Sequence, residues 1–568
     1  MVASLLELPS EVIILIVYHL PLRDIIACKQ SCHRVRTLIK DSQLLQRHFQ
    51  TMSCGVEDLF VPGICSSELL ESLEQWEVAW RKVDIGERFA RHRYHNILWT
   101  VEYVVQSGHV AAMRMGDSDW HAPPGWSYAD ISRVLIEGDE GPQDSELGWT
   151  NIQLGNAIIP KGYVLDVSQD LVVVAFYRDA IWKRMHIQFL RFTTGKSHDL
   201  ASNWTFELDL KCKSPSDCEI GMEVMGSYLV MIVTHKTRTR LPGWHQRIYF
   251  VDWTRGYTHC VRRVPEGTYF PIIAFVSKDV IVLARKHDFS LEICNITKGK
   301  RNSLFTLRTV CVLKLPSLQP SARVRLQLRN RTPLAGNPST PLPLGSSRLP
   351  FRSSPADAVL GFDIQLRRPG PEDRKFSFWV HHSVLRKYAA EAMRPPRCAA
   401  PAARNPRTAM GFVSRLVKRV DHAFASAPAR QWHEWGPQST RWRECSDEIR
   451  DRQTLAGTRC AVAQQGSLLL MDFNPGRLAK LRAQGPSKDP SLWAVVNPTV
   501  ISAGRFFRHD IISRLPYCAS VNSTIKNRVL MDDEWVLQFE EEGLFGWEGY
   551  IDFHSIIRPE SCTEKHDK

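Results

Sequence analysis

The chain has 568 residues, of which 43% are hydrophobic, and it carries a formal net charge of +13. This length is several times that of a usual domain, so we expect several structural units or one large repeat-built unit with a sizeable core. Glu7 and Glu11 interrupt the opening residues, and the apolar run from Val12 to Val17 is far too short to cross a bilayer, which favours a soluble cytoplasmic or nuclear protein over a secreted or membrane-anchored one.

Two Leu-Pro steps organise the first 48 residues. The residue before a proline is pushed out of the helical region, whereas proline suits a first helical turn, so helices are predicted to begin near Pro9 and Pro21. The first helix carries an apolar stripe: Val12, Leu15, Ile16 and Leu20. A third helix is predicted from the spacing of these residues: Cys32, Val35, Leu38 and Ile39. Three helices in about 35 residues cannot bury a self-sufficient core, so some of this apolar surface should face a partner.

The order of these residues, Leu-Pro-x-Glu, an apolar helix, Leu-Pro-x-x-Asp and a later Cys, resembles the F-box. The resemblance implies that residues 1–48 bind the Skp adaptor of a cullin-based ubiquitin ligase. The adaptor contacts that it implies are Leu8, Pro9, Ile16, Leu20, Pro21, Asp24 and Ile25. Val35 stands where many F-boxes have a tryptophan, which reduces the contact area and leaves the helical pattern intact. The alternative, a helical hairpin that only caps the rest of the chain, would need neither Leu-Pro step.

A helical linker is predicted over residues 49–98. Within it, residues 66–90 look helical because large apolar side chains recur at spacings of three and four. These side chains are Leu69, Leu70, Leu73, Trp76 and Trp80. The linker would join the F-box-like module to the body of the protein.

From residue 99 onward the pattern changes to that of strands. Three units in residues 99–315 repeat one order, a polar turn residue, a buried apolar strand and an alternating strand. With Asp170, Ser227 and Asp279 taken as equivalent, the intervals are 57 and 52 residues. Short-stranded repeats of this size suggest the blades of a β-propeller, and two stacked antiparallel sheets are the alternative. Weaker copies of the same strand pattern predict that residues 431–556 form a second part of the β body. Residues 557–568 are predicted to form a polar tail.

Residues 316–430 separate these two parts, and their net charge exceeds that of the whole chain by one, so the remainder is close to neutral. They contain 17 Arg and 3 Lys against 6 Asp or Glu, a net charge of +14. Their richness in Pro, Ala and Ser predicts a partly disordered insertion, with a strand near residues 376–388. Aromatic residues are too sparse there to favour a nucleic-acid surface, so a solvated insertion is the preferred interpretation.

The chain as a whole resembles fungal F-box proteins with divergent propeller-like bodies. The phrases that carry this resemblance are Gly267–Pro271, Trp432–Pro437, Asp472–Pro475 and Leu515–Tyr517. They lie on both sides of the basic segment, which implies that this segment is an insertion or a poorly predicted stretch of the gene. Such proteins have no known chemistry of their own.

Motifs for catalysis and for cofactors are weak. Gly195-Lys196-Ser197 lacks the glycine that a phosphate-binding loop needs five positions earlier, where Leu190 stands, so a turn is the better interpretation. No cysteine pair has a second pair at zinc-ligand spacing, and His381 and His382 are adjacent in a predicted strand, where they would point to opposite faces. We therefore predict no catalytic residues, no metal site and no cofactor.

The sequence thus predicts an α+β multi-domain protein, with an N-terminal three-helix F-box followed by a mainly-β body. The function that we expect is that of a non-enzymatic substrate receptor, which binds targets for protein degradation within a Skp-cullin-F-box ubiquitin ligase. Its partners would be the Skp adaptor, through it a cullin, and an unknown protein target bound by the body. One alternative is a scaffold that binds the adaptor without delivering a substrate. Another is a basic nucleic-acid-associated factor acting through residues 316–430, although nucleic acid is a less favoured partner. No membrane partner is expected.

Overall fold

The structure of the chain is a computed structural model. The residues it describes are 7–82, 90–95, 101–106, 108–114, 125–130, 150–154, 158–178, 184–210, 218–237, 243–265, 267–298, 305–328, 349–368, 373–393, 427–445, 455–464, 467–483, 492–522, 528–542 and 548–555. The predicted polar tail at 557–568 lies outside these residues. So do most of the Pro- and Ala-rich stretches of the basic segment.

The N-terminal region is helical, as the Leu-Pro steps predict. Its helices are α1 (Ser10–Tyr18), α2 (Leu22–Ser31), α3 (His33–Asp41) and α4 (Gln43–Cys54). Pro9 and Pro21 occupy the N-cap positions of α1 and α2 in extended conformation, so the predicted starts of both helices are confirmed. A fourth helix, not predicted separately, begins at Ser42, whose hydroxyl accepts a hydrogen bond from the Leu45 N–H at 3.3 Å.

Helix α5 (Ser66–Lys82) follows and lies within residues 66–90, where the spacing of apolar side chains predicts a helix. Four of its large apolar side chains are at most 2% exposed: Leu69, Leu73, Trp76 and Trp80. The linker is shorter than predicted, because residues 90–95 form strand β2 (Ala90–His95) of the body. This strand pairs with β34 (Glu548–Ser555), which lies more than 450 residues away in the chain. A pairing over that distance cannot be predicted from a local sequence pattern.

The remainder is a mostly-β body, in which the described residues form seven sheets of four or five strands and two smaller ribbons. We number the seven sheets in chain order. Sheet 1 contains β3 (Val101–Gln106), β4 (His109–Arg114), β5 (Gly125–Asp130) and β6 (Thr150–Gln153). Sheet 2 contains β7 (Ile159–Asp166), β8 (Leu171–Tyr177), β9 (Arg184–Arg191) and β10 (Thr205–Asp209), with the short helix η3 (Val167–Gln169) between its first two strands. Sheet 3 contains β11 (Cys218–Met225), β12 (Tyr228–Thr237), β13 (Gly243–Asp252) and β14 (Tyr257–Pro265).

The other four sheets follow the same antiparallel plan with additions. Sheet 4 contains β15 (Tyr269–Ser277), β16 (Val280–Arg285), β17 (Ser290–Lys298), β18 (Phe305–Lys314) and the parallel β23 (Ala429–Arg430). Sheet 5 contains β19 (Arg323–Leu328), β21 (Val359–Arg367), β22 (Asp373–His381) and β24 (Thr440–Cys445). Sheet 6 contains β25 (Leu455–Ala456), β26 (Arg459–Gln464), β27 (Ser467–Asp472), β31 (Tyr517–Asn522) and β28 (Leu492–Val495). Sheet 7 contains β32 (Arg528–Met531), β33 (Trp535–Glu542), β34 and β2.

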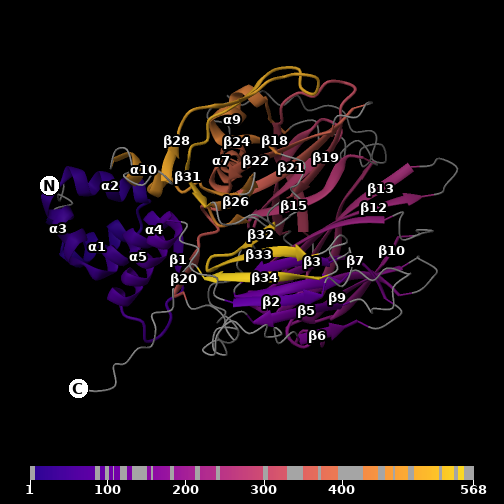
Figure 1. Cartoon of the computed structure of the whole chain (residues 1–568), viewed down its shortest axis with the longest axis horizontal. Helices are drawn as coiled ribbons and strands as arrows, with labels where there is room; N and C mark the ends of the chain where they lie inside the picture. The colour runs from indigo at the N-terminus through magenta and orange to yellow at the C-terminus, as the bar shows by residue number, and fades with distance from the viewer. Residues whose placement is uncertain are drawn as a thin grey trace, which may run out of the picture.

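Short elements connect these sheets to one another and to the helices. The two ribbons pair β1 (Val56–Asp58) with β20 (Phe351–Ser353), and β29 (Thr499–Ile501) with β30 (Ile511–Ser513). The helices of the body are α7 (His382–Met393), α9 (Trp432–Ser439) and α10 (Pro475–Ala483). Figure 1 shows the N-terminal helices at one side of the body, beside α10, and the C-terminal strands β33 and β34 alongside β2.

The repeat predicted from the sequence corresponds to a recurring turn. Asp170, Ser227 and Asp279 each lie between the first and second strands of sheets 2, 3 and 4. Asp170 has a φ of 53°, and its carboxylate accepts hydrogen bonds from the Thr193 N–H at 2.8 Å and the Thr193 hydroxyl at 2.9 Å. A short polar side chain tolerates this left-handed conformation and closes the turn.

The core consists of apolar layers between consecutive sheets. Each large cluster of buried side chains from sheet 1 to sheet 7 draws its residues from two successive sheets, and the layer between sheets 6 and 7 also includes α5. First strands of neighbouring sheets touch, as β7 touches β11 and β11 touches β15. Sheet 7 also touches sheet 1, through β32 and β3 and through a hydrogen bond from the Gly108 N–H to Asp532 at 3.2 Å. The apolar runs of the strands are therefore buried on both faces.

The described parts of the basic segment form regular structure in the middle of the body. They provide β19, β20, β21, β22, α7 and β23. Of the strand predicted near 376–388, the part up to His381 belongs to β22, and the rest is helix α7. His382 therefore does not continue a strand, and the two histidines bond to different carbonyls, those of Asp357 and Pro355.

Candidate protein-docking surface

Helix α1 presents two apolar faces, one toward its own module and one toward solvent. Ile13 and Val17 are 1% and 3% exposed and pack in the core of the module. Val12, Leu15 and Ile16 lie on the opposite face, with exposed fractions of 39%, 56% and 38%. Most of the stripe predicted from the spacing is thus the solvent-facing side of the helix, and the buried contacts come from residues that the stripe omitted.

The structure leaves most of the sequence-predicted contact residues accessible to solvent. Pro9, Ile16, Pro21 and Asp24 are exposed, and Leu8 and Leu20 are half-buried against the module core. Ile25 differs, because it is 1% exposed and packs within the module. A partner on this surface could contact the other six side chains directly. Ile25 would contribute only indirectly, by supporting the packing of the module.

The start of α2 is held in a fixed conformation. Pro21 is extended, with a ψ of 153°, and its carbonyl accepts hydrogen bonds from the Asp24 N–H at 2.9 Å and the Ile25 N–H at 3.1 Å. Asp24 lies in the first turn, where its negative charge is favourable beside the helix dipole. The Arg34 side chain of α3 donates to the Leu8 carbonyl at 3.2 Å and ties α3 to the segment that precedes α1.

Further exposed apolar side chains were not singled out from the sequence as contacts. Val12 and Leu15 on α1, Ile26 on α2 and Leu44 on α4 are each at least 38% exposed. A helical projection centred on the residues of α1 that face inward would have found the first two. Val35, at the position of the F-box tryptophan, is 5% exposed and fills the module core, so it adds nothing to the open surface.

A buried ion network joins the helical region to the body. Glu77 of α5, Arg459 of β26, Asp472 of β27 and Arg477 of α10 are each at most 5% exposed. Arg477 donates from Nε to Glu77 at 3.2 Å and also bonds to Asp472. Arg459 lies 3.3 Å from Asp472 and 3.7 Å from Glu77, so each carboxylate faces both guanidinium groups.

The network alters the pKa values of its members in opposite directions. Burial alone would lower the pKa of Arg477, but Asp472 and Glu77 outweigh burial and raise it. Burial alone would raise the pKa of Asp472, but Arg477 and Arg459 lower it. The pKa of Arg459 is lowered by burial and by the neighbouring Arg477. The pKa values of Asp472, Arg459 and Arg477 therefore depend on one another.

Aromatic and backbone contacts reinforce this joint. The Arg459 guanidinium lies 4.0 Å from the ring centre of Trp76 and 4.8 Å from that of Trp80. The Trp76 indole N–H donates to the Asp533 carbonyl at 2.8 Å, in the turn between β32 and β33. The Asn474 side chain donates to the Ser53 carbonyl at 3.4 Å, at the end of α4. The helical region is thereby anchored to both sheet 6 and sheet 7.

Other chemistry weighed from the sequence has structural explanations. Gly195-Lys196-Ser197 lies in the turn after β9, where Gly195 has a φ of 67° and Ser197 bridges Leu190. Within the described ranges, no group of three or more His, Cys, Asp or Glu side chains could hold a metal ion. No helix in the same ranges is long and apolar enough to cross a membrane.

Comparisons with known proteins find a family match at the N-terminus. Residues 5–51 match the F-box-like family, so the chain carries an F-box-like domain there. No curated protein matches. The solved structure "Structure of Kluyveromyces lactis Hsv2p" is 11% identical in sequence. The match spans 49% of this chain and 79% of the chain in that structure, with a TM-score of 0.21. "Kluyveromyces lactis Hsv2" and "Kluyveromyces lactis Hsv2 complete loop 6CD" are also 11% identical, covering 49% of this chain and 80% of their own, with TM-scores of 0.18.

Proposed function

We propose that this protein is a substrate receptor of a Skp-cullin-F-box ubiquitin ligase. The observation that carries the proposal is the F-box-like domain at residues 5–51 together with the exposed apolar face of α1, which the module core does not use. An apolar face left open on a folded helix is typical of a protein-docking surface. The proposed partner on this face is the Skp adaptor, and through it a cullin.

The proposed docking surface combines the residues implied by the sequence with those exposed beside them. It consists of Leu8, Pro9, Val12, Leu15, Ile16, Leu20, Pro21 and Asp24. Ile25 supports the surface from the core of the module. Apolar side chains would provide most of the binding free energy, and Asp24 at its rim would favour a partner with a complementary charge.

We further infer that the seven sheets are the blades of a β-propeller. The support is their order along the chain, the apolar layers between successive sheets, and the contact of sheet 7 with sheet 1. In this proposal β2 completes the last blade with the first strand of the body, and the propeller presents the target protein. Residues 90–556, including much of the basic segment, then form one body.

The proposed mechanism is proximity. A target held on the body lies beside the ubiquitin carried by the enzymes that the adaptor and cullin recruit, so its effective concentration rises without a catalytic residue in this chain. The buried network of Glu77, Arg459, Asp472 and Arg477 supports this mechanism, because a rigid joint keeps the body at a fixed orientation to the docking module.

The test is adaptor binding by the full-length protein with Val12, Leu15 and Ile16 changed to serine. The exposed fractions of these side chains add up to about 1.3 whole side chains, and a fully buried one contributes about 1.5–3 kcal/mol. Loss of that burial should weaken the Kd for purified Skp adaptor roughly 30-fold to several hundredfold. Isothermal titration calorimetry measures the Kd, and circular dichroism checks that the helices remain.

The matched control is Leu200→Ser, since Leu200 is 60% exposed but lies on the body, in the segment between β9 and β10. It should leave the Kd unchanged. An equal Kd for the triple variant and the unchanged protein would remove α1 from the docking surface. Failure of the full-length protein to bring cullin and RING subunits down with the adaptor would count against the ligase as a whole.

A further inference from the structure

One face of sheet 5 is polar across all four of its strands. In the register of the sheet, Arg325, Gln365, Lys375 and Cys445 form one row, one residue from each strand. The next row consists of Gln327, Asp363, Ser377 and Arg443. Residues two apart on a strand point to the same face, so both rows share it.

This polarity departs from the packing of the other face. Residues of alternate parity on the same strands, such as Phe362, Ile364 and Phe378, are at most 1% exposed and pack against sheet 4. On the polar face, apolar packing against sheet 6 is provided near one end, by Val359 and Trp379. Arg325 is exposed, and Gln327, Gln365 and Lys375 are half-buried, so solvent or a bound polar group can reach this face.

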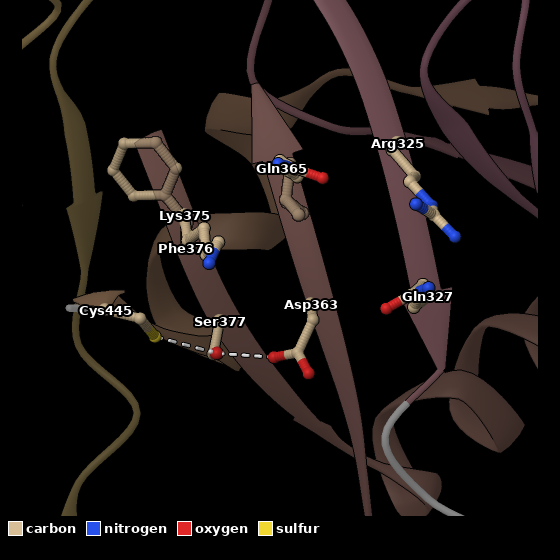
Figure 2. A pocket seen from close by; sticks show the side chains of 9 residues that line it. Arg325, Gln327, Asp363, Gln365, Lys375, Phe376, Ser377 and Cys445 are labelled. Carbon is tan, nitrogen blue, oxygen red and sulfur yellow. Dashed lines mark hydrogen bonds between the residues drawn. The ribbon is translucent and has the colours of Figure 1, made fainter. Parts of the chain in front are cut away.

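All residues of these two rows except Arg443 line a pocket with a volume of about 80 Å³. Figure 2 shows Arg325 and Lys375 on strands that flank Gln365, with the amide of Gln327 nearby. Ligand pockets for drug-sized molecules enclose roughly 300–1,000 Å³. A pocket of this size therefore fits one small group and not a nucleotide or a folded segment.

The charges in the pocket favour an anion. Arg325 and Lys375 come from strands separated by one strand, about 10 Å apart at the backbone, and Gln365 lies between them in the register of the sheet. Among the described residues that line the pocket, Asp363 is the one carboxylate, and it lies in the next row, where the Ser377 hydroxyl donates to it at 2.6 Å. Ser377 is 1% exposed and also contacts the Cys445 sulfur at 3.0 Å, so the Asp363 carboxylate is bonded to a buried hydroxyl.

We propose that this pocket is a binding site for one small anionic group, a phosphate-sized tetrahedral anion or a carboxylate. Arg325 and Lys375 contact the anion by charge-assisted hydrogen bonds, and the amide N–H groups of Gln365 and Gln327 complete its coordination. The site lies on sheet 5, separate from the docking surface on α1, and it does not depend on the adaptor.

The test uses the full-length protein titrated with inorganic phosphate and, in a second arm, with acetate, at constant ionic strength set by sodium chloride. Two charge-assisted contacts in a small pocket give an expected Kd on the order of 1 mM. Arg325→Gln and Lys375→Met should each weaken binding about tenfold or more, and Lys375→Arg should retain it. Saturation by phosphate alone assigns a tetrahedral anion, and saturation by acetate alone assigns a carboxylate.

Arg374→Gln is the matched control, since Arg374 neighbours Lys375 on β22 but points to the other face and pairs with Glu444 at 3.3 Å. It removes the same charge and should leave the Kd unchanged. The proposal is overturned if neither anion saturates the protein, or if Arg325→Gln and Arg374→Gln weaken binding equally. Urea unfolding of each variant separates these results from a loss of folding.

Discussion

Glu77→Gln is the sharpest probe of the joint between the helical region and the body. The change keeps the shape of the side chain and removes one of the two carboxylates that face Arg459 and Arg477. Breaking a buried ion pair by removing one partner costs about 3–5 kcal/mol, because a buried charge is left uncompensated. The Gln amide oxygen can still accept one N–H from Arg477, so we expect about 3 kcal/mol.

Tryptophan fluorescence during urea unfolding measures this loss of stability, with Trp76 and Trp80, which flank Arg459, among the 17 tryptophans that contribute to the emission. Glu74→Gln is the matched control. Glu74 lies on the same helix but is exposed, so its change should alter the unfolding free energy by less than about 0.5 kcal/mol. The Kd for the adaptor should stay the same in both variants, because the proposed docking surface lies on α1 and α2.

The reasoning is refuted if Glu77→Gln destabilises the protein no more than Glu74→Gln does. A double variant sharpens the result. Changing Glu77 and Arg477 together to methionine removes one charge of each sign and leaves Asp472 with Arg459, so the double change should cost less than the sum of its two single changes. Additive losses would show that these side chains act only by packing.

Three further predictions concern the body. Burial raises the pKa of Asp532 to about 7, so the native state holds a proton that the unfolded chain releases near its ordinary pKa of 3.8; stability should therefore fall as pH rises from about 4 to about 7, and Asp532→Asn should flatten that part of a urea-midpoint profile. Gly221→Ala would place a Cβ 2.2 Å from the Pro271 carbonyl oxygen where β11 meets β15, and calorimetric melting should show a loss of about 1–3 kcal/mol. Trp253→Phe leaves the Gly226 carbonyl without its indole donor at 2.9 Å and should lower the urea midpoint by the equivalent of about 1–3 kcal/mol.

Local signals predicted the helical module and the repeating strands well. The starts of α1 and α2 follow from Pro9 and Pro21 because proline acts on its own neighbours. The turns at Asp170, Ser227 and Asp279 were aligned from sequence because each follows the same order of polar and apolar residues. These features depend on residues close together in the chain, and a sequence displays such relations directly.

The joint could not be predicted, because its partners are far apart. Glu77 and Arg477 are separated by 400 residues, and the sequence around each one indicates only a solvent-facing charge on a helix. Strand β2 was assigned to the linker for the same reason, since its partner β34 is the last strand of the body. Helix α7 was missed because the basic composition around it favoured an insertion over regular structure.

The sequence predicted part of the proposed docking surface, namely its apolar residues but not the direction in which they face. Periodicity gave the stripe of Val12, Leu15 and Ile16 but not its direction, because Ile13 and Val17 form an equally apolar face. Which face turns inward depends on α3 and α4, whose packing no single helix encodes. The same limit explains Ile25, which the F-box resemblance implied as a contact and which the module buries.

Because β2 pairs with β34, β2 cannot find its partner in the sheet until the ribosome has synthesised most of the chain. Ala90 pairs with Phe553, so β2 leaves the ribosome more than 450 residues before its neighbour in the sheet. At about 5–20 residues per second, this interval lasts on the order of half a minute. The N-terminal helices are complete throughout that time, while β2 remains an unpaired edge of the kind that favours aggregation. A premature stop codon before residue 548 would therefore yield a chain that still carries its helical module but has a permanently unpaired strand.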